Sequence, residues 1–334
     1  MAKRSEWADA HEDSLEADAL RAQLADLQAR VAFYESLKPT PRGREIPPHK
    51  STGGNAIPIV LASDWHVEQR VDAADVPGAY NLYNPAIARK RSEQFAQKTV
   101  LLTNVQRGMC KITEMVLFLG GDFITGHLHD DNRESNWMSP VKAILLAMDL
   151  LNGVIKHLLD HGNFERITLP CCFGNHSRLT HKPRAKTAPD TSLEWMMYNL
   201  LATHWKHEKR LVFHIADAVQ LYLPVFEYPI RFMHGDDVSY GGGVGGITIP
   251  MRRAIADWDK TKRAYCSMFG HFHTAVDIGN AIGNGSLIGA NAYGVRIHAA
   301  YEPPRQQFVL IDQKRGKSSV SHIYTDYLPP ITKE

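Results

Sequence analysis

Five apolar segments, far apart in the sequence, are each followed at once by a residue able to bind a metal ion or transfer a proton. The segments are IPIVLAS, EMVLFLGG, RITLPCCFG, YPIRFM and YCSMFG. The residues that follow them are, in the same order, Asp64 and His66, Asp122, Asn175 and His176, His234, and His271 and His273. Short apolar runs of this kind predict buried β-strands. Ligand residues gather at the carboxyl ends of strands in open α/β sheets, so we expect the five exits to surround one crevice.

Segments with helical patterns separate these strands. Asn84 before Pro85, and Ser139 before Pro140, are typical of a helix N-cap and first helical residue. They predict helices that run to about Arg107 and to Gly162. The remaining patterns predict helices near 191–204 and 249–263, strands near 211–215, 218–223, 229–233 and 264–269, and final strands in VRIHAAYE (295–302) and QQFVLID (306–312). Strands that alternate with helices, followed by a strand-rich end, predict a layered α/β protein.

Two of the ligand pairs have the same spacing. Asp64 and His66 are two residues apart, as are His271 and His273. In extended backbone this spacing directs both side chains to one side, so Phe272 could point inward while its histidine neighbours face the site. One Asp-x-His pair is more often incidental than a ligand pair. Five such positions in order, each behind a predicted strand, are not plausibly coincidental.

The ordered set resembles the calcineurin-like metallophosphoesterase superfamily, whose pattern is D-x-H, G-D, G-N-H, a lone H and G-H-x-H. It occurs here as DWH (64–66), GGD (120–122), GNH (174–176), MHGDD (233–237) and GHFH (270–273). The resemblance covers roughly residues 57–312 and implies a β-sandwich flanked by helices. A looser resemblance is to the double-strand-break-repair nuclease branch and its phage-encoded relatives.

The resemblance also implies a role for each residue. One ion would be held by Asp64, His66, Asp122 and His273, and a second by Asp122, Asn175, His234 and His271. His176 would protonate the leaving oxygen of the substrate. The oxygen and nitrogen ligands suit two divalent ions, manganese first, with iron, zinc or magnesium as alternatives. Such ions can hold a phosphate oxygen and activate water at neutral pH, which implies phosphodiester hydrolysis without a phosphoenzyme.

The sequence around the motifs bears on the substrate. Many relatives have an acidic residue after G-N-H, whereas Ser177 and Arg178 follow here, in a segment (176–186) that is basic and has no acid. Arg252 and Arg253 follow a glycine-rich stretch, and His127, His129 and Arg133 lie in a segment predicted to be a lip of the site. These six residues are candidate substrate contacts: His127, His129, Arg133, Arg178, Arg252 and Arg253. A basic rim favours nucleic acid, and DNA most of all, although a solvated basic face is equally compatible.

Three alternatives to a nuclease stay open. The first is a small-molecule phosphodiesterase acting on cyclic nucleotides or nucleotide messengers. The second is a phosphoprotein phosphatase, against which the missing acidic neighbour of His176 counts modestly. The third is a catalytically silent scaffold assembled through the N-terminal helix, although every ligand-type position is intact.

The N-terminal part predicts a separate element. Ala17, Leu20, Leu24, Leu27, Val31 and Tyr34 alternate at spacings of three and four, which is the seam of a short coiled coil. We expect a helix over 1–37, a proline-containing linker over 38–56 and the catalytic domain over 57–334. Residues 15–35 would form a homo-oligomer or pack on their own domain. The absence of a signal-peptide core and of a long apolar run predicts a cytoplasmic protein outside the membrane.

Overall fold

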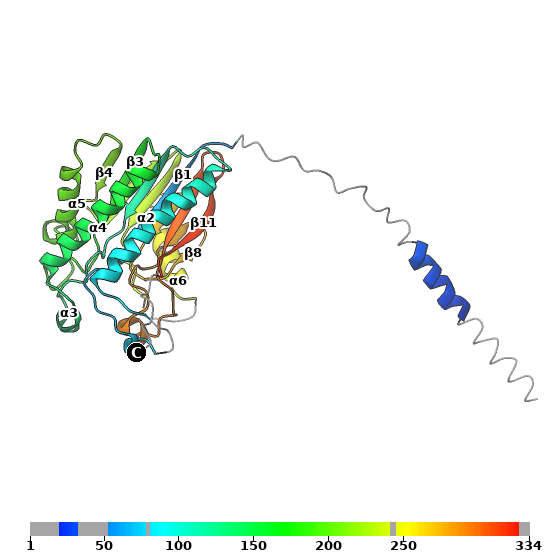
Figure 1. Cartoon of the computed structure of the whole chain (residues 1–334), viewed down its shortest axis with the longest axis horizontal. Helices are drawn as coiled ribbons and strands as arrows, with labels where there is room; N and C mark the ends of the chain where they lie inside the picture. Colours follow the sequence, from blue (N-terminus) through cyan, green and yellow to red (C-terminus); the bar gives the residue numbers. More distant parts are fainter. Residues whose placement is uncertain (1–19, 33–52, 78–80, 241–244, 327–334) are drawn as a thin grey trace, which may run out of the picture. The chain divides into compact units, whose positions relative to one another are not determined.

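The structure is a computed structural model that describes residues 20–32, 53–77, 81–240 and 245–326 (Figure 1). The chain divides into two compact units, Met1–Lys50 and Ser51–Glu334. In the first unit, residues 20–32 form a helix. Its heptad residues within that range are all exposed: Leu20, Leu24, Leu27 and Val31. The rest of the predicted stalk and the predicted linker as far as residue 52 lie outside the described residues, so the domain boundaries and the coiled coil stay predictions.

The second unit contains two β-sheets. The six-stranded sheet has the order β11-β10-β1-β2-β3-β4 and the five-stranded sheet the order β5-β6-β7-β9-β8. The strands of the first are β1 (Ala56–Ala62), β2 (Glu114–Leu119), β3 (Arg166–Cys171), β4 (Leu211–Ile215), β10 (Arg305–Asp312) and β11 (Gly316–Tyr324). Those of the second are β5 (Gln220–Val225), β6 (Tyr228–Met233), β7 (Cys266–Phe269), β8 (Val276–Asp277) and β9 (Ala281–Gly283). Strands β1 to β4 are parallel, as are β6, β7 and β9.

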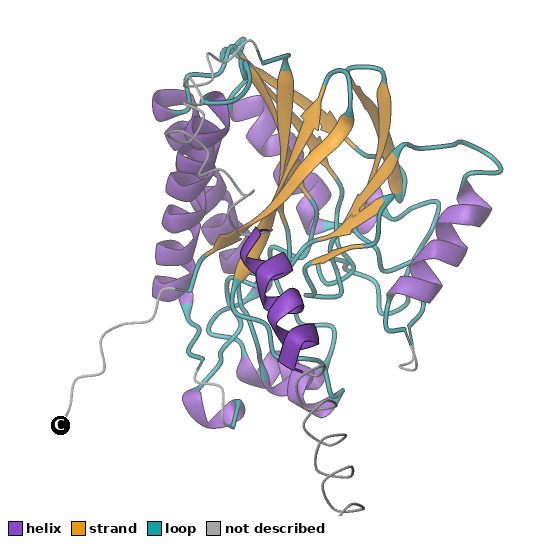
Figure 2. Ribbon diagram, turned by 90° about the vertical axis from the view of Figure 1, so that its right-hand side faces the viewer, coloured by secondary structure: helices purple, strands orange, loops and turns teal. Residues whose placement is uncertain are grey.

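Alternation along β1 shows how the layers form. Ile59 and Leu61 pack with Phe232 and Met268 of the second sheet, whereas Val60 joins the core beneath the helices. Side chains alternate across a strand, so a strand apolar on both faces can be buried between two layers. Figure 2 shows the resulting arrangement, with the strands flanked by helices.

Helices α2 (Pro85–Arg107), α4 (Pro140–His161) and α5 (Leu193–His204) contribute the helical side of that core. Helix α6 (Thr248–Trp258) packs through Met251 and Ile255 against the second sheet. The remaining short elements are η1 (Ala73–Asp75), α3 (Asp130–Ser135), η2 (Pro189–Thr191) and α7 (Ala292–Arg296). The predicted layered α/β fold and the predicted starts of α2 and α4 are confirmed. The Asn84 side chain caps α2 by accepting from two backbone N–H groups, whereas Ser139 makes no such bond.

The predicted strand over 295–302 is wrong. These residues form the end of α7 and a loop, and residues 295–301 are exposed. Alternating apolar and polar residues suggest a strand only if a neighbouring strand is available, and this segment pairs with none of the described strands. Within the described ranges, no helix has both the length and the apolar character needed to cross a membrane.

Candidate metal centre

The predicted ligands lie on loops that leave the carboxyl ends of five strands. Strands β1, β2, β3, β6 and β7 lead into the five motifs. Eight described residues other than glycine have a positive φ, and five of them are predicted ligands: Asp64 (57°), His66 (47°), Asp122 (52°), His271 (69°) and His273 (51°). Such conformations are uncommon and gather at functional sites, where surrounding structure must hold them.

This geometry corrects one expectation. Asp64 and His66 do share a site, and so do His271 and His273, but their backbones are left-handed rather than extended. The chain turns sharply after each strand, so the pairs converge through the turn and not through strand alternation. Phe272 packs against the core of the second sheet, as expected.

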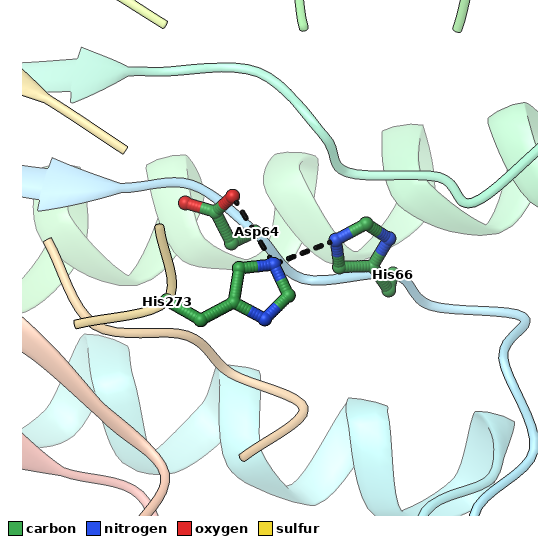
Figure 3. Close-up of side chains that lie close together, drawn as sticks. All are labelled: Asp64, His66 and His273. Carbon is green, nitrogen blue, oxygen red and sulfur yellow. Dashed lines mark hydrogen bonds and ion pairs between the residues drawn. The ribbon is translucent and has the colours of Figure 1, made fainter. Parts of the chain in front are cut away.

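The first ligand group consists of Asp64, His66 and His273, whose ligand atoms all lie within 4.8 Å of one another. Nε2 of His273 is 3.1 Å from Nε2 of His66 and 3.5 Å from a carboxylate oxygen of Asp64. Figure 3 shows the three side chains converging from two separate segments of the chain. The Asp64 carboxylate also accepts hydrogen bonds from the Ser63 hydroxyl (2.5 Å) and the His271 backbone N–H (3.0 Å). Its orientation is therefore fixed by contacts outside the group.

The second group consists of Asp122, His234 and His271, again with ligand atoms within 4.8 Å of one another. Nε2 of His234 is 3.0 Å from Oδ2 of Asp122 and 3.1 Å from Oδ1 of Asn175. The Asn175 side chain therefore lies against Nε2 of His234, as the Asp122 carboxylate does. The metal-binding role of all seven predicted ligands stays a prediction, but the structure gathers them as that role requires.

In two of the candidate ligand histidines, the ring nitrogen Nδ1 already has a hydrogen-bond partner outside the ligand groups. The Nδ1–H of His234 donates to the Gly120 carbonyl (2.7 Å), which leaves Nε2 as the nitrogen available to a metal. Nδ1 of His66 lies 3.2 Å from the Thr125 hydroxyl. Metal-binding histidines typically use the second nitrogen in this way, because the bond fixes the tautomer and the ring orientation.

The electrostatics of the centre suit bound cations. Burial lowers the pKa of His66 well below its usual value, that of His271 to about 3 and that of His273 to about 4, so these rings are neutral at pH 7. Burial raises the pKa of Asp122, but His234 outweighs burial and holds it well below its usual value. Neutral imidazoles beside buried carboxylates are the form in which these side chains bind divalent metals. His234 is the exception: burial lowers its pKa, but the Asp122 carboxylate outweighs burial and holds that pKa well above its usual value, so a metal bound there would displace a proton from this ring. The donor set therefore fits two such ions.

His176 lies beside the first group rather than within it. Its ring centroid is 5.1 Å from that of His66, in an edge-on contact. Its Nδ1–H donates to the Thr125 carbonyl (2.9 Å), and its backbone N–H donates to Oδ1 of Asp122 (2.9 Å). The side chain is thus held at the centre with Nε2 left for exchange of a proton.

Two motif glycines make close approaches that no other residue allows. A Cβ on Gly174 would lie 2.0 Å from Oδ1 of Asp122, and a Cβ on Gly270 would lie 2.5 Å from Oδ2 of Asp64. Each glycine therefore lets one motif loop pack directly on a carboxylate supplied by another. This contact explains the glycine of GNH and the glycine of GHFH.

Two buried glutamates support the centre and were not predicted. Glu194 accepts backbone N–H bonds from Asp122 (3.2 Å), Phe123 (2.6 Å) and Gly174 (2.7 Å). Oε1 of Glu68 accepts the N–H groups of Thr125 and Gly126, both at 2.8 Å. Burial raises the pKa of Glu194 to about 7 and that of Glu68 to about 8. Both bind backbone rather than a motif side chain, so the sequence offers no signal beyond an acid near an apolar run.

The candidate substrate contacts have varied surroundings. Arg178 bonds the Asn175 carbonyl, and its Nε is buried without a partner. Arg252 bonds the Ile278 carbonyl, and Arg253 is exposed on α6. The other three follow Gly126 in a segment that is partly exposed: His127, His129 and Arg133. No hydrogen bond or ion pair in the described ranges joins these three to the ligand groups.

A cavity of about 210 Å³ opens beside the second group. His234 and Gly174 line it on the side of the centre. Arg184 lines it from the basic segment, together with Asp236 and Asp237 from the loop after β6. The cavity therefore has a cation and two carboxyl groups within reach of one molecule.

Comparisons with known proteins give structural matches only. No family model and no curated protein matches the chain. One similar solved structure is a conserved uncharacterized protein from Streptococcus pneumoniae TIGR4, described as a predicted phosphoesterase (14% identity, 83% of this chain and 94% of that chain, TM-score 0.35). Others are YfcE, a phosphoesterase from E. coli (14% identity, 80% and 100%, TM-score 0.32), and Vps29 from Entamoeba histolytica complexed with Zn²⁺ (11% identity, 80% and 99%, TM-score 0.31).

Proposed function

We propose that the protein is a metal-dependent phosphodiesterase that hydrolyses nucleic acid, with DNA as the leading substrate and manganese as the leading metal. The proposal is carried by the convergence of two adjacent ligand groups and His176 at the ends of five strands. Divalent ions bound there would polarise a phosphate oxygen and supply a water of lowered pKa at neutral pH.

In this proposal, the position of each side chain determines whether it binds metal or transfers a proton. Asp64, His66 and His273 would hold one ion, His234, His271 and Asn175 would hold the other, and Asp122 would contribute to both. His176, fixed by the Thr125 carbonyl, gives a proton from Nε2 to the departing oxygen. A general acid of this kind typically contributes about 10²- to 10⁴-fold to the rate.

The basic segment that leaves the GNH motif supports a polyanionic substrate. Lys182, Arg184 and Lys186 are all exposed, and Arg184 reaches the cavity beside His234. A row of exposed cations that begins at the catalytic loop can neutralise the phosphates on either side of the bond that is cut. Arg178, which bonds within its own loop, acts instead by bracing Asn175.

The test compares substrates with purified protein that has been stripped and reloaded with Mn²⁺. We expect hydrolysis of bis(p-nitrophenyl) phosphate and of single-stranded DNA, and DNA cleavage that falls steeply with salt. Lys182→Gln with Lys186→Gln should weaken DNA cleavage and flatten its salt dependence. The matched control is Lys206→Gln with Lys209→Gln, which removes the same charge from exposed positions outside the basic segment. Equal salt dependence in the two double variants would contradict the nucleic-acid assignment.

A small-molecule phosphodiesterase is the second candidate, favoured by Asp236 and Asp237 in the cavity. Carboxyl groups suit the hydroxyls of a ribose better than a row of phosphates. Turnover of cyclic nucleotides, with none of DNA, would select this candidate. A protein that binds no metal and hydrolyses neither diester would instead be a scaffold.

A further inference from the structure

Residues 292–301 (AYGVRIHAAY), here called the tyrosine loop, comprise α7 and the chain that follows it. Tyr293, Val295, Ile297 and Tyr301 are 63, 46, 54 and 55% exposed, which is unusual for four large apolar side chains in one short segment. Contiguous exposed apolar groups commonly mark a binding surface. In Figure 1 the segment is drawn in orange at the end of the domain where α3 also lies.

The chain on either side of the tyrosine loop is hydrogen-bonded to residues at or near the first ligand group. Before it, the Leu287 backbone N–H donates to the carbonyl of the predicted ligand Asp64 (3.0 Å). After it, the Glu302 carboxylate accepts the N–H of Ala275 (3.1 Å), two residues beyond the predicted ligand His273. The chain therefore enters and leaves the loop beside segments that carry the first ligand group.

The charge of the tyrosine loop favours an anionic ligand. It contains Arg296, which is exposed, and no acidic residue. The nearest acid in the sequence, Glu302, is already engaged by Arg305 (2.8 Å) as well as by Ala275. Exposed aromatic rings interleaved with a cation are the combination that binds unpaired nucleotides, since rings stack on bases while cations meet phosphates.

We propose that the tyrosine loop is a stacking platform for single-stranded nucleic acid, on which Tyr293 and Tyr301 stack on bases and Arg296 contacts the backbone next to the bond that is cut. This inference rests on the proposed nuclease function and extends it, because it assigns a preference for unpaired strands. A duplex keeps its bases stacked on one another and offers these rings only its phosphates.

Binding is measured by fluorescence anisotropy with a labelled twelve-nucleotide oligo(dT) and the Mn²⁺-loaded His176→Ala variant, in which cleavage is slow enough for binding to be read. In this background, Tyr293→Ala with Tyr301→Ala should weaken binding by about 30-fold or more, because each of the two stacked bases contributes about one to three kcal/mol. Tyr293→Phe with Tyr301→Phe keeps the rings and should bind within about threefold of the parent protein. Leu101→Ala with Val105→Ala, which removes exposed apolar groups from α2, is the control and should change nothing.

The possible outcomes distinguish a failure of the stacking platform from a failure of the proposed nuclease function. If the parent protein cleaves DNA but the alanine pair binds the oligonucleotide unchanged, or a blunt duplex binds as well as the single strand, the platform is overturned while the nuclease stands. If the protein hydrolyses bis(p-nitrophenyl) phosphate and neither binds nor cleaves DNA, both fall. Light scattering that shows a dimer broken only by the alanine pair would identify the loop as a protein-docking surface and also overturn the platform.

Discussion

Nε2 of His66 and Nε2 of His273 face each other at 3.1 Å, although 207 residues separate them in the sequence. Burial holds both rings neutral, so their lone pairs or a single shared proton occupy the space between them. A carboxylate oxygen of Asp64 lies 3.5 Å from Nε2 of His273. A divalent ion would replace this crowded contact with two coordinate bonds and balance the carboxylate charge.

We therefore expect Mn²⁺ to stabilise the metal-stripped protein. Binding to the folded state alone contributes about 2.7 kcal/mol at a free metal concentration about 100 times Kd, which raises Tm by several degrees. His273→Ala should reduce the rise, and His207→Ala, an exposed histidine outside the centre, should not. Differential scanning calorimetry with and without Mn²⁺ measures the effect. A Tm insensitive to metal would argue against the ligand assignment.

A second prediction concerns His176. Its replacement by alanine removes the proposed acid without removing a ligand, so metal content should stay at the parental level while turnover of a small diester falls by about 10²- to 10⁴-fold. Elemental analysis and steady-state kinetics check the two halves together. His207→Ala again serves as the control. Undiminished turnover would exclude His176 from the chemistry, and lost metal would mean that it is a ligand instead.

That the candidate ligands lie together could be predicted because each is within a few residues of an apolar run that forms a strand. Asp122 and His234 are examples, because each can be identified from its own place in the sequence without knowing which residues lie beside it in the fold. Glu68 and Glu194 could not, because they act through backbone N–H groups of loops whose positions only the folded chain defines. The strand predicted over 295–302 is wrong for a related reason: the alternation resembles a strand, and only the sheet topology shows that none of the described strands pairs with it.

The close approach of Gly174 to Asp122 makes a sharp mutational prediction. Gly174→Ala would place a methyl group 2.0 Å from Oδ1 of Asp122 and 2.4 Å from its backbone nitrogen, so the Asp122 carboxylate must move. We expect metal content and turnover both to fall, turnover by about 100-fold for a displacement near 1 Å. Gly153→Ala, on the exposed side of α4 with nothing within 4 Å of the added group, is the matched control and should be neutral or slightly stabilising. An active Gly174→Ala enzyme with full metal would disprove the packing argument.

Glu68 positions His176 through Thr125. One carboxylate oxygen accepts the N–H groups of Thr125 and Gly126, and the Thr125 carbonyl in turn accepts from His176. The other oxygen, Oε2, has no partner within hydrogen-bond distance, so Glu68→Gln can keep both bonds through its remaining oxygen. Glu68→Ala should lower kcat by about 10-fold or more with little change in KM, and Glu68→Gln should restore most of it. If both variants lose activity equally, the two hydrogen bonds do not account for the role of Glu68.

The last prediction concerns the N-terminal unit, where we propose that helix 20–32 pairs with a second copy of the chain. Its exposed apolar residues follow a heptad seam, and 13 residues are too few for a stable isolated helix in water. Leu24→Asp places a charge in the seam and should lower the mass measured by light scattering, as should deletion of residues 1–50. Ala29→Asp adds the same charge to the opposite face and should leave the mass unchanged. Hydrolysis of bis(p-nitrophenyl) phosphate should survive all three changes, because no predicted ligand lies in this unit. An unaltered mass in the Leu24→Asp protein would refute self-association through the helix.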